Sequence, residues 1–473
     1  MERIRNAAVP IAVVISAVAS IAAMVALLVR NPPLVNDEPL YAARGLGLGV
    51  IWPGYRAPGL PFVASLIGSG NPVLLRSATV LSMVVLAVSA GLLTWRLSRN
   101  AVAGWIGAGL VISAPGLIQT AVQFLPDVPG TLLVVLAVLV VVLSIHEDRL
   151  SWWSLAAVPI ALAANYMRFS ASVPILAGIV SIALFRRSVF QRSKAVVVAL
   201  GIGLILVTGV SNFLPQPGSD DGRSAWSANQ ELIEGKAETL EDRGRSLVLS
   251  SASTVGLERQ ISSLTPAGLL YAVGCGVALL AAVWKWRSAG PYLLWAALTL
   301  AVYIVTLGHF EVRYMVPVAV PLLCAAALGV SEVMRDRQVV LAAAVGSVCL
   351  AGVAFGADQA MRIQDMETEP RQALVEAGEF IRSVADGRCT LRKTLDDDHD
   401  VNPEGYVGLT AVAVVSGCDV DPDSEHAFVV QSIPSGESPA RPPLFERSYR
   451  YFDVDAATWR NQQTIVFRGG GEP

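Results

Sequence analysis

Two adjacent carboxylates follow the first long apolar stretch of the sequence. Asp37 and Glu38 come eight residues after the end of an apolar run at residues 7–29, which is long enough to cross a bilayer. They belong to the sequence NDEPLY at residues 36–41. Carboxylates at a membrane surface are unfavourable against lipid and typical of functional sites. The alternative is that both are ordinary solvated loop charges, and position alone does not decide between the two.

Basic residues share this segment with the carboxylates. Arg44 and Arg56 lie downstream, and residues 55–62 (YRAPGLPF) form an amphipathic stretch with Pro and Gly breaks that suits a membrane interface. An acid and a base on one interfacial segment suit a reaction on a lipid phosphate. Tyr41, with Arg44, is a candidate supporting residue.

Two single charges stand at the ends of later apolar stretches. Asp127, in LPDVPG at residues 125–130, begins a long apolar run, where it could be an N-cap, a catalytic carboxylate or both. Arg168 lies alone between two apolar windows. It is either a snorkelling interface arginine or an anion ligand for phosphate.

A fourth polar group lies between two late apolar windows. Residues 308–317 read GHFEVRYMVP and carry His309, Glu311, Arg313 and Tyr314. A local Glu–Arg pair and an interfacial tyrosine would explain part of this turn, but four such groups in so short a turn favour a site. His309 by itself is a weak metal signal, because no partner histidine lies at ligand spacing.

Composition identifies the class of protein. The chain has 473 residues, of which 53% are hydrophobic and 15% charged, and a mean hydropathy of +0.55. This excludes an ordinary soluble domain. The net charge of −3 gives no reason to expect nucleic-acid binding. The first apolar run is too long for a signal peptide and has no small-residue cleavage site, so it is expected to be a retained helix.

The apolar windows predict an α-helical polytopic membrane protein with about eleven spans. They are Ala7–Val29, Pro72–Trp95, Ala101–Ile118, Pro129–Ile145, Trp152–Tyr166, Phe169–Phe185, Ala195–Leu214, Pro266–Trp284, Pro291–Leu307, Tyr314–Val330 and Val339–Gly356. Lys and Arg precede the first span and follow every even-numbered one, which predicts a cytoplasmic N-terminus. Abundant Ala, Val and Arg with little Lys suits a prokaryote, and hence a plasma membrane.

This alternation places the polar segments outside the cell. The outer loops are residues 30–71, 119–128, 215–265 and 308–313, with the Met167-Arg168 turn. The predicted domains are a transmembrane catalytic domain, 1–358, and a small extracytoplasmic α/β domain, 359–473. Loop 215–265 is expected to be a lid or interfacial segment with helical stretches at Ala228–Leu240 and Gly256–Ser263.

The C-terminal domain combines one helix with short strands. Residues Glu367–Asp386 have helical spacing, and the β-like runs are Cys389–Leu395, Tyr406–Ser416, Ala427–Ser432, Arg447–Val454 and Thr464–Arg468. Cys389 and Cys418 are the domain's only cysteines. Outside the cell, antiparallel pairing of the first two runs could join them in a disulfide; the alternative is two unpaired thiols. Cys275, Cys324 and Cys349 lie in apolar runs and are expected to be packing residues.

Taken together, these motifs resemble the GT-C superfamily of membrane glycosyltransferases. Asp-Glu-x-x-Tyr after the first span looks like its signature, and the closer resemblance is to protein O-mannosyltransferases and lipid A aminoarabinose transferases. The similarity extends to Arg56-Ala57-Pro58, to Asp127 beside proline, and to the turn from His309 to Pro317. It covers residues 1 to about 330. Arg56 stands where the family commonly has lysine.

The resemblance implies transfer of a sugar, hexosyl or pentosyl, from a polyprenyl-phosphate donor to an acceptor hydroxyl, with inversion. Asp37 is the expected base, with Asp127 as its partner, and Arg56, Arg168 and Arg313 with Tyr314 are the expected phosphate ligands. No cofactor is required; a divalent ion held by Asp37, Glu38 and Asp127 is an alternative. The expected partners are the lipid-linked donor, membrane lipids, and a glycan, lipid or protein acceptor.

Two other classes of protein compete with this interpretation. A secondary transporter or lipid flippase would explain the many helices, but it predicts ionisable residues near the bilayer midplane. The central thirds of these spans are almost free of charge. A membrane-anchored binding protein would need far fewer spans. The transferase is therefore the favoured hypothesis.

Overall fold

The computed structural model describes most of the chain. The described residues are 2–30, 32–34, 37–50, 52, 56–214, 224, 227, 265–306, 312–385, 389–393, 403–420, 427–434, 443–453 and 458–468. The predicted helices at Ala228–Leu240 and Gly256–Ser263 fall outside these ranges, as do His309 and Glu311.

The chain forms two compact units. Unit 1 consists of Met1–Leu27, Pro53–Gly59 and Thr79–Ala360, and unit 2 of Leu28–Trp52, Leu60–Ala78 and Met361–Pro473. Unit 2 therefore combines the C-terminal part of the chain with two segments from near the N-terminus. The functional division at residue 358 stays a prediction.

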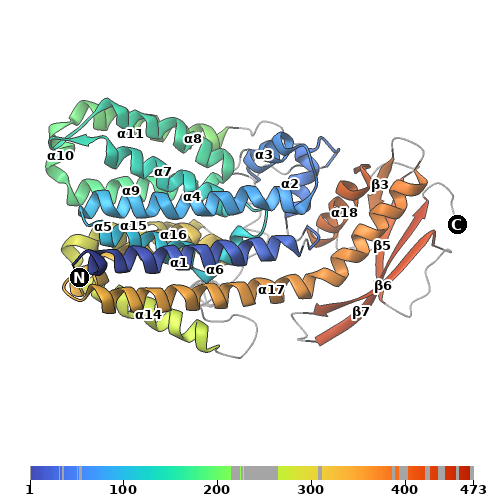
Figure 1. Cartoon of the computed structure of the whole chain (residues 1–473). Helices are drawn as coiled ribbons and strands as arrows, with labels where there is room; N and C mark the ends of the chain where they lie inside the picture. The colour runs from blue at the N-terminus through green and yellow to red at the C-terminus, as the bar shows by residue number, and fades with distance from the viewer. Residues whose placement is uncertain are drawn as a thin grey trace. The chain divides into compact units, whose positions relative to one another are not determined.

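Helices, with two short strands, make up unit 1 (Figure 1), and one end each of α1, α4 and α17 belongs to unit 2. Their bounds are α1 Glu2–Val29, α4 Pro72–Ser98, α5 Ala101–Ile112, α6 Pro115–Ala121, α7 Asp127–Leu143, α8 Ala157–Met167, α9 Ser172–Phe185, α10 Arg187–Arg192, α11 Lys194–Phe213, α14 Pro266–Trp284, α15 Trp286–Thr306, α16 Val316–Val333 and α17 Gln338–Val384. The short elements are β1 Ile145–His146, β2 Arg149–Leu150, η1 Trp152–Ala156, η2 Phe169–Ala171 and η3 Val312–Met315. Each of the eleven predicted apolar windows overlaps one of these helices or an adjoining pair.

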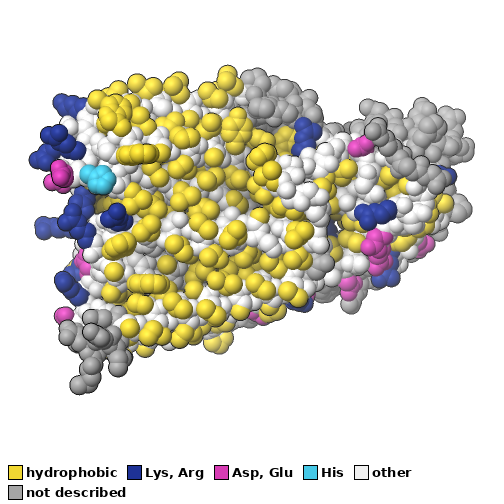
Figure 2. Space-filling view, turned by 45° about the horizontal axis from the view of Figure 1, so that its top comes forward, with side chains coloured by type: hydrophobic (Ala, Val, Ile, Leu, Met, Phe, Trp, Pro, Cys, Tyr) yellow, Lys and Arg dark blue, Asp and Glu magenta, His cyan; other side chains and the backbone are white. Residues whose placement is uncertain are grey.

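The apolar composition of these helices suits a multi-pass membrane protein. Six helices of the described chain are long and apolar enough to cross a membrane, or seven if α5 and α6, bent by 57°, form one span. The figure of eleven crossings stays a prediction. Many large apolar side chains are exposed on the helices, for example Val18, Leu81 and Leu280, and Figure 2 shows them covering the flank of unit 1. Such a surface is stable against lipid and not against water.

Helix α16 lies at the centre of unit 1 and packs against α5, α14 and α15. Of its most apolar 18-residue window, 78% is buried. Small residues allow this close packing: a side chain at Gly329 would collide with the backbone of Ala282 on α14.

Unit 2 contains a mixed sheet of five strands within its described residues. The strands are β3 Thr390–Lys393, β4 Asp419–Val420, β5 Phe428–Pro434, β6 Phe445–Asp453 and β7 Thr458–Arg468, in the order β4-β3-β5-β7-β6. Strand β3 pairs in parallel with β4 and β5, and the β5–β7 and β6–β7 pairs are antiparallel. This agrees with the predicted α/β domain.

One predicted strand is wrong. Residues Tyr406–Ser416 lie in helix α18, Pro403–Ser416. Because β3 and β4 are parallel, the chain must cross over between them, and α18 supplies the crossover. The helix buries Leu409, Val412 and Ala413, and it ends at Gly417, whose φ of +79° suits glycine.

Cys389 and Cys418 form a disulfide, as the sequence predicts. The reason proposed from the sequence is wrong, however. The two cysteines do not close an antiparallel pair; each immediately precedes one of the parallel strands β3 and β4. The three cysteines of the apolar windows are buried and free, as expected of packing residues.

Candidate functional site

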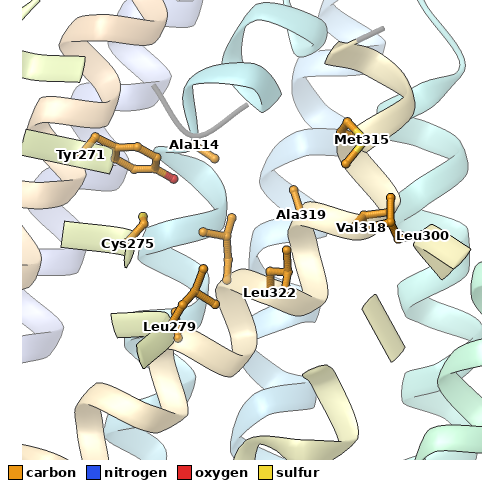
Figure 3. Close-up of a pocket in the computed structure, with 11 residues that line it drawn as sticks. Ala114, Tyr271, Cys275, Leu279, Leu300, Met315, Val318, Ala319 and Leu322 are labelled. Atoms are coloured by element: carbon orange, nitrogen blue, oxygen red, sulfur yellow. The ribbon is translucent and has the colours of Figure 1, made fainter. Parts of the chain in front are cut away.

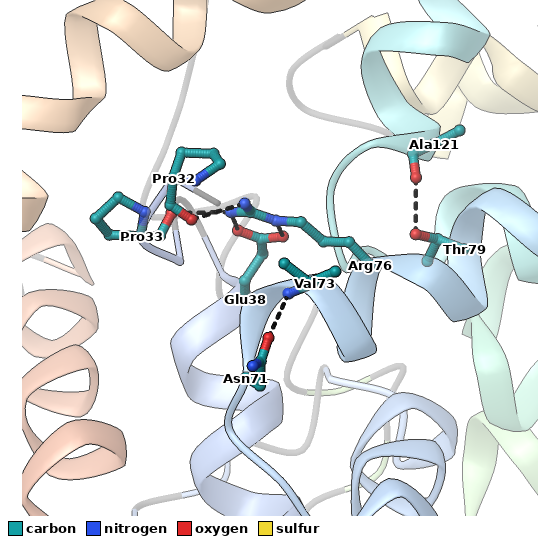
Figure 4. Close-up of polar contacts among 8 residues, drawn as sticks. All are labelled: Pro32, Pro33, Glu38, Asn71, Val73, Arg76, Thr79 and Ala121. Carbon is teal, nitrogen blue, oxygen red and sulfur yellow. Dashed lines mark hydrogen bonds and ion pairs between the residues drawn. The ribbon is translucent and has the colours of Figure 1, made fainter. Parts of the chain in front are cut away.

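Glu38 is buried in an ion pair with Arg76, which the sequence analysis did not identify (Figure 4). Helix α2 runs over Glu38–Gly45 and begins with this glutamate. Arg76 Nε donates to Glu38 Oε1 at 2.8 Å and Nη2 donates to Oε2 at 2.6 Å. The two side chains are 2% and 0% exposed. Arg76 also donates to the carbonyl oxygens of Pro32 and Pro33, both at 2.8 Å. Its guanidinium thus holds the segment before Asp37 against α4.

Asp37 differs from its neighbour in its environment. It is half-buried and occupies the N-cap position of α2, but its side chain makes no capping bond in the described structure. The two adjacent carboxylates therefore have different roles: Glu38 is fixed by Arg76, while Asp37 does not serve the helix as a cap.

The other two predicted residues of this segment have structural partners. Tyr41 is buried and packs edge-on against Trp52, with ring centroids 5.7 Å apart. Arg44 donates to the Val50 carbonyl oxygen at 3.4 Å. The segment also joins the sheet: Val420 N donates to Gly49 O at 3.0 Å, and Gly49 N donates to Asp419 Oδ1 at 3.0 Å. These contacts support the loop that carries Asp37.

In unit 1 the structure brings Asp127 and Arg168 together. Arg168 Nη1 donates to Asp127 Oδ1 at 2.6 Å, and the side chains are 10% and 3% exposed. Asp127 is the first residue of α7, and Pro126 is the N-cap. The N-cap interpretation of Asp127 is therefore wrong, although its charge still suits the positive end of the helix. A second bond, from Arg168 Nε to Ser170 Oγ at 2.9 Å, orients the guanidinium.

Aromatic rings and a second arginine surround Arg168. Its Cζ lies 5.3 Å from the ring centroid of Tyr314 and 6.0 Å from that of Tyr303. Arg313 Cζ lies 5.2 Å from the same Tyr314 ring. These distances are within cation–π range. Burial alone would lower the pKa of Arg168, but attraction to Asp127 and the two tyrosines outweighs burial and nearby Arg313, so the net pKa shift is upward.

Glycines allow the chain to pass close to this cluster. A Cβ at Gly59 would lie 2.7 Å from Tyr166 O and 2.8 Å from Met167 Cα. The chain at Gly59, three residues after half-buried Arg56, therefore lies directly against the end of α8. A Cβ at Gly130 would lie 3.2 Å from Arg168 Cβ. Gly59 leaves no room for a side chain, because the atoms in the way are backbone, and Gly130 is tightly packed. They let the first turn of α7 lie against the Arg168 side chain, and the chain at Gly59 lie against the backbone of Tyr166 and Met167.

An apolar cavity of about 130 Å³ adjoins the cluster (Figure 3). It lies between α14, α15 and α16, with Ala114 from the α5–α6 bend on one side. Met315, which follows Tyr314, lines the cavity and packs in one apolar core with Tyr303 and Val318. The wall is almost wholly apolar: Ala114, Tyr271, Cys275, Leu279, Leu300, Met315, Val318, Ala319, Leu322, Leu323 and Ala326.

The structure therefore groups Asp127, Arg168, Arg313 and Tyr314 and adds Tyr303, and the roles expected of these residues stay predictions. Asp37 and Glu38 lie in unit 2. The signal for Arg76 was a charge inside an otherwise apolar window; no sequence pattern points to Tyr303.

No group of three or more His, Cys, Asp or Glu is arranged to hold a metal within the described ranges. The carboxylates of Glu38 and Asp127 each accept from an arginine, which competes with metal binding. The divalent-ion alternative remains untested.

Known proteins resemble this chain in part of its sequence and in its fold. Residues 59–212 match the family described as dolichyl-phosphate-mannose-protein mannosyltransferase. The matched segment includes Asp127 and Arg168. No curated protein matches the chain's sequence.

The fold is similar to those of ArnT and an archaeal oligosaccharyltransferase, in line with the resemblance predicted from the sequence. ArnT from Cupriavidus metallidurans bound to undecaprenyl phosphate aligns with a TM-score of 0.56 and 13% identity, over 96% of this chain and 97% of that one. The oligosaccharyltransferase of Archaeoglobus fulgidus, in a complex with Zn and sulfate, gives 0.55 and 14% over 86% and 62%. AglB from the same organism, with an inhibitory peptide and a dolichol-phosphate, gives 0.52 and 13% over 86% and 63%.

Proposed function

We propose that the chain is a glycosyltransferase that moves a sugar, hexosyl or pentosyl, from a polyprenyl-phosphate donor to an acceptor hydroxyl. One observation carries the proposal: the Asp127–Arg168 pair, with Tyr303, Tyr314 and Arg313 around it, adjoins an apolar cavity. A lipid phosphate has two parts that complement this arrangement: an anion, which suits the arginines, and an apolar chain, which suits the cavity. The likeness to ArnT bound to undecaprenyl phosphate supports the choice of lipid.

The arginines would stabilise the departing phosphate. A sugar on a polyprenyl phosphate already has a good leaving group, because the phosphate needs no proton at neutral pH. The developing charge needs nearby cations. Arg168 uses Nη1 for Asp127 and Nε for Ser170, and its Nη2 would donate to the phosphate. Arg56 and Arg313 would add charge, and Tyr314 a hydroxyl.

Asp37 would take the proton of the acceptor hydroxyl as it attacks the anomeric carbon. The hydroxyl oxygen forms the new glycosidic bond while the bond to the phosphate oxygen breaks, and in-line attack inverts the anomeric centre. Asp37 is half-buried, whereas Glu38 is fully buried and paired with Arg76, which supports Asp37 over Glu38 for this role. Asp127 would keep Arg168 oriented and charged.

We further propose that unit 1 has its basic end in the cytoplasm and that the protein lies in a plasma membrane. Lys and Arg gather at the end of unit 1 where α10 lies (Figures 1 and 2). Positive loops favour the cytoplasmic side. Asp127 and Arg168 lie at the opposite helix ends from Leu143 and Ala157, which supports the proposal that donor chemistry takes place on the outer face. The C-terminal domain would then be extracytoplasmic, where its disulfide is stable.

The test is consumption of lipid-linked sugars by the full chain in nanodiscs, followed by mass spectrometry. Polyprenyl-phosphate-linked hexoses and pentoses are supplied with glycan, lipid and peptide acceptors. One donor should be consumed, and Arg56→Ala, Arg168→Ala and Arg313→Ala should each slow its consumption by about 10²-fold, because each removes a charge from a partly dry site. Arg192→Ala, an exposed arginine, is the matched control. Consumption of no donor, or equal rates in all four variants, would refute the proposal.

A further inference from the structure

Unit 2 contains a polar pocket, which shares no residue with the cluster around Arg168 in unit 1. Its volume is about 220 Å³, and its walls come from the chain after α1 and from α17. They consist of Arg30, Pro32, Pro33, Gln364, Asp365, Thr368 and Gln372. A water molecule takes about 30 Å³ in the liquid, so the pocket has room for several waters, on the scale of one sugar ring.

A buried amide in this pocket has an unused acceptor. Gln364 is 8% exposed, and its Oε1 is buried without a hydrogen-bond partner in the described structure. Leaving such a group unsatisfied is unfavourable, because it has lost its hydrogen bonds to water without gaining another. The neighbouring Thr368 hydroxyl does not relieve it, because it donates to the Gln364 backbone oxygen at 2.6 Å. The pocket therefore favours a ligand that brings a donor to Gln364 Oε1.

The charges around the pocket select a neutral ligand. Arg30 Nη2 donates to Asp365 Oδ1 at 2.7 Å, and these side chains are 44% and 62% exposed, so a cancelled pair forms the rim. An anion would face Asp365, Gln364 Oε1 and the proline carbonyls. A cation would face Arg30, and Arg76 already donates to both proline carbonyls. A sugar hydroxyl can donate and accept at once, which matches this wall.

We infer that this pocket binds a neutral sugar ring, with Gln364 Oε1 accepting from a ring hydroxyl and the Arg30–Asp365 pair contacting another. The sugar would belong to the acceptor or to the lipid-linked donor. This sugar site would extend the proposed glycosyltransferase function. The assignment of the sugar to the acceptor or to the donor rests on that proposed function. Residues 32 and 33 connect the pocket to Asp37 through the segment that Arg76 holds.

Saturation-transfer NMR on the full chain in nanodiscs tests the binding. Methyl glycosides of neutral hexoses and pentoses, up to about 20 mM, are the probes. At least one should bind the wild type, and Gln364→Leu should weaken it by at least about tenfold. Gln359→Leu is the matched control, because Gln359 is equally buried, at 8%, on the same helix without lining the pocket. Asp365→Asn, at the exposed rim, should weaken binding several-fold even if Gln364→Leu does not fold.

The outcomes separate the pocket from the proposed function. A wild type that binds no glycoside, or two pocket variants that bind as the wild type does, would overturn the inference. In the transfer assay, a raised acceptor KM in Gln364→Leu identifies the acceptor's sugar, and a raised donor KM identifies the donor's. If glycosides bind but no lipid-linked sugar is consumed, the pocket stands and the glycosyltransferase proposal fails.

Discussion

Arg168 and Asp127, 41 residues apart in the sequence, form a nearly buried ion pair with a 2.6 Å contact. Neither residue has a charged neighbour in its own apolar run. The pair links the first turn of α7 to the break between α8 and α9. One guanidinium thereby joins two helix ends and lies over Tyr314.

We expect removal of Arg168 to destabilise the protein as well as slow it. Arg168→Ala leaves Asp127 buried without its partner, which typically costs about 3–5 kcal/mol. The combined change Asp127→Asn with Arg168→Gln should recover much of that loss but not donor binding. Thermal unfolding and undecaprenyl phosphate binding, both measured in nanodiscs, check the two parts. If Arg168→Ala unfolded at the same temperature as the wild type, the argument from the buried ion pair would be wrong.

Asp37→Asn should abolish transfer while the protein remains folded. Loss of a positioned base costs about 10²–10⁴-fold in rate, and Asp37 makes no described capping bond to α2 whose loss would destabilise that helix. Sugar release from the donor that the nanodisc assay identifies is the measurement, with unfolding temperature as the control. Near-normal turnover would remove Asp37 from the mechanism.

The Glu38–Arg76 pair should prove structural. Glu38→Leu or Arg76→Met alone leaves a buried charge, at a cost of about 3–5 kcal/mol, whereas the two changes together should be close to neutral. A double-mutant cycle by thermal unfolding gives the coupling. The double variant should lose rate, since Pro32 and Pro33 lose their donor. Additive single effects would argue against the pair.

Gly59→Ala should slow transfer by displacing the Arg56 segment. The new Cβ would meet Tyr166 O at 2.7 Å and Met167 Cα at 2.8 Å, both backbone atoms that cannot rotate away. We expect roughly 1–3 kcal/mol of destabilisation, as for overpacking, and a raised donor KM. Gly201→Ala, with open space around it, is the control. Equal donor KM values in the two variants would show that the contact is unimportant.

Loss of the Cys389–Cys418 disulfide should destabilise unit 2. The bridge spans 29 residues, which corresponds to about 3.5 kcal/mol on the chain-entropy model. Cys389→Ser with Cys418→Ser should unfold the sheet at lower temperature, as measured by limited proteolysis. Thiol-blocking mass spectrometry on the unreduced wild type should find both cysteines blocked to alkylation. Free thiols would also count against the proposed outward placement of the domain.

The sequence by itself determined which segments are helices in lipid and which residues are chemically unusual. Apolar windows of membrane length leave the backbone no partner but itself, so each window becomes a helix. The charged residues at window ends, Asp37, Asp127, Arg168 and Arg313, are visible for the same reason: they interrupt a composition that otherwise excludes them. The disulfide followed from there being only two cysteines in the polar part of the chain.

The tertiary structure decided which charges meet. Arg76 lies inside an apolar window, and only folding shows that Glu38 neutralises it. Residues 406–416 are rich in Val and read as a strand, yet the parallel pairing of β3 and β4 requires a helix there. Helix α17 continues through Pro370 to Val384, whereas the sequence suggested a new segment. Local sequence patterns reflect the free-energy cost of exposing a residue to lipid or water. Which residues distant in the chain come into contact depends on tertiary packing, and no local pattern contains that information.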